Sequence, residues 1–152
     1  MKTAEEVLLQ KKATNNFIQS NMKVIDALKQ LDAVNLSYLI VKDGDEVKGI
    51  FSERDYARKV ILKGKSSNET TVNEIMTTEL PKVQIDDSVE KCMNLLAEHG
   101  RRYILVMNKN KFEGVITIHD LLREILLHGE RVFDNKITSK LIDINEHPTV
   151  VY

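Results

Sequence analysis

The sequence predicts an α+β fold, α/β-like in its mixture of elements, made of two tandem β-α-β-β-α units. The first observation behind this is an internal repeat: Gly49–Asp55 reads GIFSERD, and Gly114–Asp120, 65 residues further on, reads GVITIHD. The second is the order of patterns in each copy. Apolar residues at three- and four-residue spacing, typical of helices, alternate with short β-rich runs.

The repeat extends well beyond these seven residues. Without a gap, residues 18–64 align with residues 83–129 and give ten identities in 47 positions. Ordinary composition would give roughly three, so a duplicated unit is well supported. One copy alone would expose a face of its sheet, and we therefore expect the two units to pack sheet to sheet with pseudo-two-fold symmetry.

Two helices are expected in each copy. The first follows the polar starts Ser20-Asn21 and Asp86–Ser88, which can cap a helix. The second begins at Ser52 or Thr117 and ends near a glycine, a common helix stop. The predicted strands cover residues 17–19, 38–41 and 47–51 in the first copy, and residues 82–84, 103–107 and 112–116 in the second.

The boundaries follow from the repeat. Residues 1–64 form the first repeat, 65–81 a polar linker and the start of the second repeat, and 82–130 the second repeat. Thr71–Met76 is expected to form a short helix inside the linker. Residues 131–152 form a loosely amphipathic tail with no counterpart in the first copy.

Composition disfavours several classes of partner. Charged residues make up 30% of the chain, but the net charge is −1, which provides no positive field for nucleic acid. The apolar runs are far shorter than the roughly 18 residues that span a bilayer. The N-terminus lacks the pattern of a signal peptide, so we expect a cytoplasmic protein without membrane contact.

Few residues suggest catalysis or metal binding. The single cysteine, Cys92, lies in an apolar-periodic segment and is interpreted as a core residue. The four histidines show no metal-ligand spacing, and we predict no metal site. No P-loop, dinucleotide-binding glycine motif or nucleophile elbow is found, so we expect no enzymatic activity.

The most informative local pattern places a small hydroxyl residue and an aspartate three residues apart, where a strand turns into a helix. It occurs as Ser52 with Asp55 and again as Thr117 with Asp120. One interpretation is helix capping. The other is a ligand site, since a hydroxyl and free amides suit a phosphate and a carboxylate can accept ribose hydroxyls. Both can hold at once.

These features together resemble the cystathionine-β-synthase (CBS) domain pair, over about residues 5–130. The segments Ser52–Val60, Lys63–Ser67 and Val72–Thr77 are similar to the stand-alone CBS-pair proteins of bacteria and plants. The resemblance implies clefts between the two repeats that hold AMP, ATP, NAD(H) or an S-adenosyl compound. It also implies that Asp55 and Asp120 hold ribose.

The resemblance implies further site residues. Ser52 and Thr117 would lie near phosphate, and Ile18 and Val83 would frame adenine unless they are core residues. Arg101 and Arg102 precede a strand of the second repeat, where the family often has a basic residue that reaches phosphate, whereas the first repeat has no charge there. They could instead be solvated loop residues. The aligned pair Arg54 and His119 could also approach an anion, although a surface role is the default interpretation of His119. The proline frequent in the family's strand is replaced by Ile40 and Leu105.

The implied function is a regulatory module that binds AMP or another adenosyl compound, requires no cofactor, and serves energy or redox sensing. The resemblance also implies a homodimer formed through helices, with one dominant phosphate site in the second repeat. The alternative is an interaction module that regulates a partner enzyme, with no ligand in its clefts and with the tail at residues 131–152 carrying the contact.

Overall fold

The protein is described by a computed structural model for residues 2–12 and 16–128. These residues divide into two compact units. The first-repeat unit contains residues 16–79, and the second-repeat unit contains residues 80–128 together with residues 2–12. The N-terminal residues, which the sequence analysis placed in the first segment, thus pack with the second repeat.

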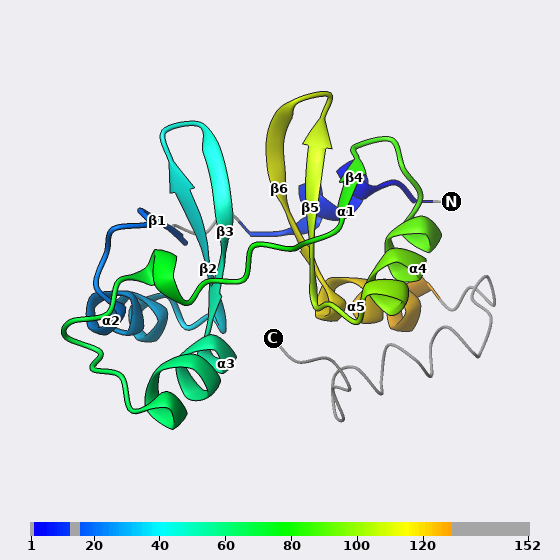
Figure 1. Ribbon diagram of the computed structural model, residues 1–152. Coiled ribbons are helices and arrows are strands. Elements are labelled where there is room, and N and C mark those ends of the chain that lie inside the picture. The colour runs from blue at the N-terminus through cyan, green and yellow to red at the C-terminus, as the bar shows by residue number, and fades with distance from the viewer. Residues whose placement is uncertain (1, 13–15, 129–152) are drawn as a thin grey trace. The chain divides into compact units, whose positions relative to one another are not determined.

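Both units contain the predicted β-α-β-β-α order, which confirms the fold class (Figure 1). The first helix, the two hairpin strands and the start of the second helix in the first copy each lie 65 residues before their counterparts in the second copy. The first-repeat unit contains β1 (Phe17–Ile18), α2 (Val24–Val34), β2 (Tyr38–Asp43), β3 (Glu46–Ser52), α3 (Glu53–Asp55), η1 (Tyr56–Val60), η2 (Ile61–Lys63) and η3 (Val72–Glu74). The second-repeat unit contains α1 (Ala4–Gln10), β4 (Lys82–Gln84), α4 (Val89–His99), β5 (Tyr103–Asn108), β6 (Lys111–Thr117) and α5 (Ile118–His128).

Each unit has one three-stranded sheet, in the order β1-β2-β3 or β4-β5-β6. The first pair of strands is parallel and the second antiparallel, and the hairpin register matches in the two copies: Tyr38 pairs with Ser52, and Tyr103 with Thr117. The hairpin strands are longer than predicted because each turn needs only two residues. Positive φ angles at Gly44 (60°) and Lys109 (57°) close these turns.

The start of α2 differs from the sequence prediction. Ser20-Asn21 do not cap this helix; its N-cap residue is Lys23, which makes no side-chain cap. Backbone carbonyls satisfy the first amides instead: Val24 N donates to Thr70 O (2.9 Å) and Ile25 N to Ser67 O (3.0 Å). In the second repeat the predicted cap is confirmed, because Ser88 Oγ accepts from Lys91 N at 3.1 Å.

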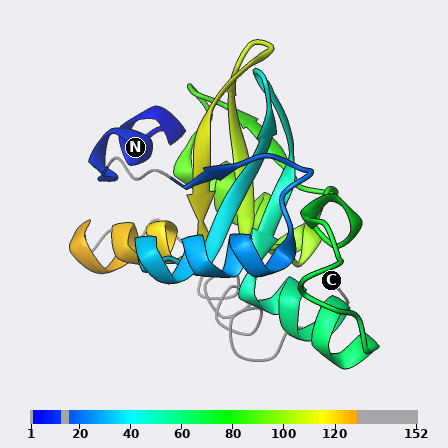
Figure 2. The same ribbon diagram turned by 90° about the vertical axis from the view of Figure 1, so that its left-hand side faces the viewer.

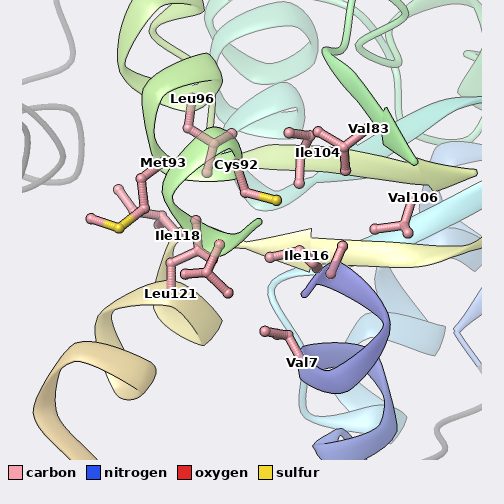
Figure 3. Packing of buried hydrophobic residues seen from close by; sticks show 12 residues of the cluster. Val7, Val83, Cys92, Met93, Leu96, Ile104, Val106, Ile116, Ile118 and Leu121 are labelled. Carbon is pink, nitrogen blue, oxygen red and sulfur yellow. The ribbon is translucent and has the colours of Figure 1, made fainter. Parts of the chain in front are cut away.

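Each unit has its own hydrophobic core. In the second-repeat unit, Val7 of α1 joins a cluster with Cys92 of α4 and Ile116 of β6 (Figure 3). Cys92 is fully buried, which confirms the prediction of a core residue. Burial raises the pKa of its thiol to about 12. It is therefore an inert packing group at neutral pH.

A segment from before each repeat covers the sheet of the other repeat. Helix α1 lies beside β6 (Figure 2), and Leu8 approaches Gly114 so closely that an added Cβ would lie 2.9 Å from its Cδ2. In the first-repeat unit, Thr77 pairs with Ile50, with N···O distances of 2.8 and 2.9 Å. The linker between the repeats is thus partly a structural element of the first-repeat unit.

The described residues contain no helix that is both long and apolar enough to cross a bilayer. The predicted helix end at Gly64 is confirmed, with φ +67°. The second predicted stop, Gly129, and the tail at residues 131–152 lie outside the described residues.

Candidate functional site

Both hydroxyl–aspartate pairs lie at a strand-to-helix turn and form the same reciprocal cap. Asp55 N donates to Ser52 Oγ at 3.3 Å, and Ser52 N donates to Asp55 Oδ2 at 2.9 Å. The corresponding distances for Thr117 and Asp120 are 3.2 Å and 2.8 Å. The capping interpretation is therefore confirmed in both repeats. In both aspartates, Oδ2 is the oxygen that accepts from the amide of the hydroxyl residue.

The Asp55 carboxylate is almost fully enclosed, with 1% of its side chain exposed. Its Oδ2 accepts from the amide and the hydroxyl of Ser52. Its Oδ1 lies 2.8 Å from Lys59 Nζ and accepts from Thr77 Oγ1 at 3.0 Å. Each oxygen thus has two donors from the first-repeat unit, as a buried charge requires.

Asp120 is occupied differently. Its Oδ2 accepts from the amide and the hydroxyl of Thr117 and lies 2.7 Å from Lys11 Nζ. Its Oδ1 lies 4.0 Å from Arg123, at the long limit of an ion pair. Its side chain is 9% exposed. Asp120 therefore keeps one oxygen that is less occupied than either oxygen of Asp55.

The predicted arginines lie on the connection from α4 to β5. The carbonyl of Arg102 accepts from Ile118 N at 3.0 Å, which places its backbone beside the turn at Thr117. Arg101 N donates to Leu96 O at 3.1 Å and closes the end of α4. Both arginines are half-buried. The first repeat has Ser37 at the position of Arg102, with the same backbone bond to Glu53 N.

The other predicted site residues range from exposed to fully buried. His119 is exposed and Arg54 is half-buried, each in the first turn of its helix. Ile18 and Val83, with 4% and 2% exposure, pack in the cores of their own units. A framing role for these two residues stays a prediction.

Sequence reasoning missed the two lysines on the aspartates. Lys59 follows Asp55 by four residues on a helical run, a spacing that favours an ion pair and could have been noticed. Lys11 is 109 residues from Asp120, and no local pattern indicates this contact. Only the packing of α1 on the second repeat brings the pair together.

Two further features bear on chemistry. Within residues 2–12 and 16–128, no group of three or more histidine, cysteine, aspartate or glutamate side chains could hold a metal ion.

A surface hollow of about 290 Å³ lies beside α1, and none of the predicted site residues lines it. Its lining residues are Glu5, Leu8, Leu9, Ile85, Asn108 and Glu113.

The amino-acid sequence has clear relatives. It is 36% identical over 108 residues to the mitochondrial CBS domain-containing protein CBSX3 of Arabidopsis thaliana, covering 68% of this chain and 52% of that protein. It covers 45% of a relative from Methanopyrus kandleri, so the chain spans about half the length of these curated relatives. It is 26% identical to YhcV of Bacillus subtilis, over 68% of this chain and 74% of that protein.

Solved structures agree with the fold. A CBS-domain protein from Burkholderia ambifaria MC40-6 matches 88% of this chain and 99% of its own, with 36% identity and a TM-score of 0.77. A CBS domain protein from Pyrobaculum aerophilum, solved in complex with AMP, matches 93% of this chain and 98% of its own, with 18% identity and a TM-score of 0.68. The family model for the CBS domain matches residues 13–61 and 72–127. With one matched copy in each repeat, the chain belongs to the CBS domain family.

Proposed function

We propose that this chain is a regulatory, non-catalytic CBS pair that binds an adenine nucleotide or a related adenosyl ligand through the turn at Thr117 and Asp120. The observation that carries the proposal is the less occupied Oδ1 of Asp120 at a largely buried strand-to-helix turn. The AMP complex of the relative from Pyrobaculum aerophilum supports the ligand class. AMP, ATP and NAD(H) all belong to this class, and no cofactor is required.

The proposed contacts follow from the chemistry of each group. Asp120 Oδ1 would accept a ribose hydroxyl, as acidic residues do in other nucleotide sites. The guanidinium groups of Arg101 and Arg102 would bind phosphate, because they offer paired donors. Thr117 and His119 would lie at the phosphate side. The cleft between repeats that the family resemblance implies stays a prediction.

The first repeat is expected to bind more weakly or not at all. Both oxygens of Asp55 already have two donors, so a ribose would have to displace Lys59 or Thr77. The first repeat also has Leu36 and Ser37 in place of the two arginines. Ser52, Arg54 and Ile18 would then have mainly structural roles. The proposed sensor therefore has one dominant ligand site.

The direct test is isothermal titration of the chain with AMP, ATP, NADH and S-adenosylmethionine, followed by the matched variants Asp120→Ala and Asp55→Ala. Both variants lose the same reciprocal cap and a lysine ion pair, so melting curves first establish that each variant is folded. Any difference in affinity therefore reports on the ligand. We expect Asp120→Ala to weaken binding about tenfold or more and Asp55→Ala to weaken it less.

Two outcomes would contradict the proposal. If none of the four ligands gives a heat of binding or a shift in melting temperature, the proposed ligand-binding function is wrong. Equal losses in the two folded variants would remove the assignment of the dominant site to the second repeat. In the first case, regulation of a partner enzyme without a ligand would become the favoured function.

A self-associating chain is also proposed. Exposed leucine and isoleucine side chains lie at equivalent places near the end of the second helical run of each repeat: Ile61 (56%), Leu62 (77%), Leu126 (83%) and Leu127 (66%). Apolar patches of this kind are typical of interfaces. A structural relative, the CBS-CP12 protein of bloom-forming cyanobacteria, is hexameric. We propose a homodimer for this chain.

A further inference from the structure

The two aspartates obtain their lysine partners in different ways. In the first repeat, Lys59 comes from the same helical run, four residues after Asp55. The equivalent position in the second repeat, 65 residues on, is Glu124, which is 6% exposed. The local helix thus supplies an acid where the first repeat supplies a cation. A second buried carboxylate one helical turn after Asp120 would be unfavourable without cations from elsewhere.

The N-terminal segment provides both of the required cations. Lys11 Nζ lies 2.7 Å from Asp120 Oδ2 and donates to the carbonyl of Val115 at 2.8 Å. Lys2 Nζ lies 2.9 Å from Glu124 Oε2. The two lysines flank α1, one before and one after the helix. Residues 2–12 therefore replace, from a distant part of the sequence, the ion pair that the first repeat makes locally.

The position of Lys11 is fixed by how α1 is held. Thr3 and Glu6 form a capping box at its start. Ala4 N donates to Asp87 O at 2.8 Å, and Glu5 N donates to Ile85 O at 2.9 Å. The apolar face of α1 is anchored in the core of the second-repeat unit, with Val7 2% exposed. Lys11 follows directly as the C-cap residue, so its ammonium group reaches Asp120 from a rigid support.

We infer that Lys11 is a positioning residue of the ligand site at Asp120, which makes helix α1 part of that site. The inference rests on the proposed function. Lys11 holds Oδ2, which leaves Oδ1 as the acceptor for a ribose hydroxyl. Its charge also cancels that of the carboxylate, which would otherwise repel the phosphate of a nucleotide.

The charge effect distinguishes this role from a purely structural one. Loss of the ammonium group should weaken binding of a phosphorylated ligand much more than binding of the uncharged nucleoside. The chain offers a matched control in Lys12, which is exposed and adjacent in sequence. Removing Lys12 changes the net charge equally but leaves the ion pair with Asp120 intact.

The experiment is isothermal titration of the full chain with AMP and with adenosine, for the wild type and the variants Lys11→Met, Lys11→Gln, Lys11→Arg and Lys12→Met. Melting curves establish that each variant is folded. We expect Lys11→Met to weaken AMP binding about tenfold and adenosine binding less than about threefold. Lys11→Arg should keep most of the AMP affinity, and Lys12→Met should resemble the wild type.

If Lys11→Met does not fold, Lys11→Gln serves in its place, because its amide can still donate to Asp120 but carries no charge. Unchanged AMP affinity in a folded, uncharged variant would overturn the inference, as would equal losses for AMP and adenosine. In both cases the wild type still binds AMP, and the proposed function stands. If the wild type binds neither AMP, ATP nor NADH, the proposed function fails and the inference fails with it.

Discussion

Asp55 and Asp120 occupy equivalent positions and make the same cap, yet their second oxygens have different surroundings. Oδ1 of Asp55 faces Lys59 and Thr77, whereas among the described residues Oδ1 of Asp120 faces only the distant guanidinium of Arg123. A fully occupied carboxylate stabilises its own unit, and a partly occupied one can still accept from a ligand. The two turns therefore differ in the individual donors that surround each carboxylate.

The buried thiol of Cys92 should make the free energy of unfolding depend on pH. Burial raises the pKa of its thiol from 9.0 to about 12. Below pH 9.0 the thiol is protonated in both the folded and the unfolded chain. Above pH 9.0 the thiol ionises only in the unfolded chain, and this ionisation favours unfolding. The free energy of unfolding therefore falls as the pH rises toward 12. The effect is about 1.4 kcal/mol per pH unit.

The measurement compares the wild type with Cys92→Ala, which introduces the residue of the equivalent position, Ala27. Denaturant unfolding from about pH 8.5 to about pH 10.5 should bring the two free energies of unfolding closer by up to about 2 kcal/mol. The variant lacks the thiol and corrects for the lysines and tyrosines that titrate in this range. Parallel pH profiles would show that the thiol ionises as easily in the folded chain.

At the scale of elements, two equivalent glycines let a covering segment approach a sheet. At Gly49 an added Cβ would lie 2.5 Å from the backbone oxygen of Thr77. At Gly114 it would meet the end of the flexible Leu8 side chain at 2.9 Å. A backbone carbonyl in a hydrogen-bonded bridge cannot move away without loss of that bridge, but a leucine side chain can rotate.

We therefore expect Gly49→Ala to lower the free energy of unfolding by about 2 to 3 kcal/mol and Gly114→Ala by less than about 1 kcal/mol. Chemical denaturation of the two variants beside the wild type measures both. The pair is internally controlled, since both changes add one methyl group to equivalent strands. The reverse order of stability would contradict the contacts of Thr77 and Leu8.

In the whole molecule, the second-repeat unit is completed by a segment from a distant part of the sequence, and the first-repeat unit is completed by the linker that follows it. Residues 2–12 pack with residues 80–128, and the linker through Glu79 packs with the first repeat. The second-repeat unit is therefore not a contiguous piece of chain, whereas the first-repeat unit continues without a break through the linker. Cutting the sequence at the repeat boundary would leave one sheet without α1 and the other without η3.

The exposed leucine side chains near the end of α5 predict self-association. The double variant Leu126→Ser with Leu127→Ser should shift the chain toward the monomer in analytical ultracentrifugation, with little change in stability because both side chains are exposed. Leu9→Ser is the control, as Leu9 is 78% exposed but lies on α1. A wild-type monomer, or an equal shift in the control, would contradict a dimer through these helix ends.

The repeat, the order of elements and the positions of both hydroxyl–aspartate turns could be predicted from the amino-acid sequence alone. Periodicity and capping depend on residues that are close together in the sequence, and the repeat is visible by comparing the sequence with itself. The sequence also identified Cys92 as a core residue. The start of α2 was predicted wrongly because its caps are carbonyls of Ser67 and Thr70, which are more than 40 residues away.

Which donors surround Asp120 depends on tertiary packing and could not be predicted from the sequence. Lys11 and Asp120 are 109 residues apart, and nothing in the sequence near either residue specifies the other. The contact arises because the apolar face of α1 must be buried, and Gly114 leaves room for it on β6. Local patterns fix where each aspartate lies in the chain, whereas long-range packing fixes its electrostatic environment and leaves Oδ1 of Asp120 with fewer close donors than Oδ1 of Asp55.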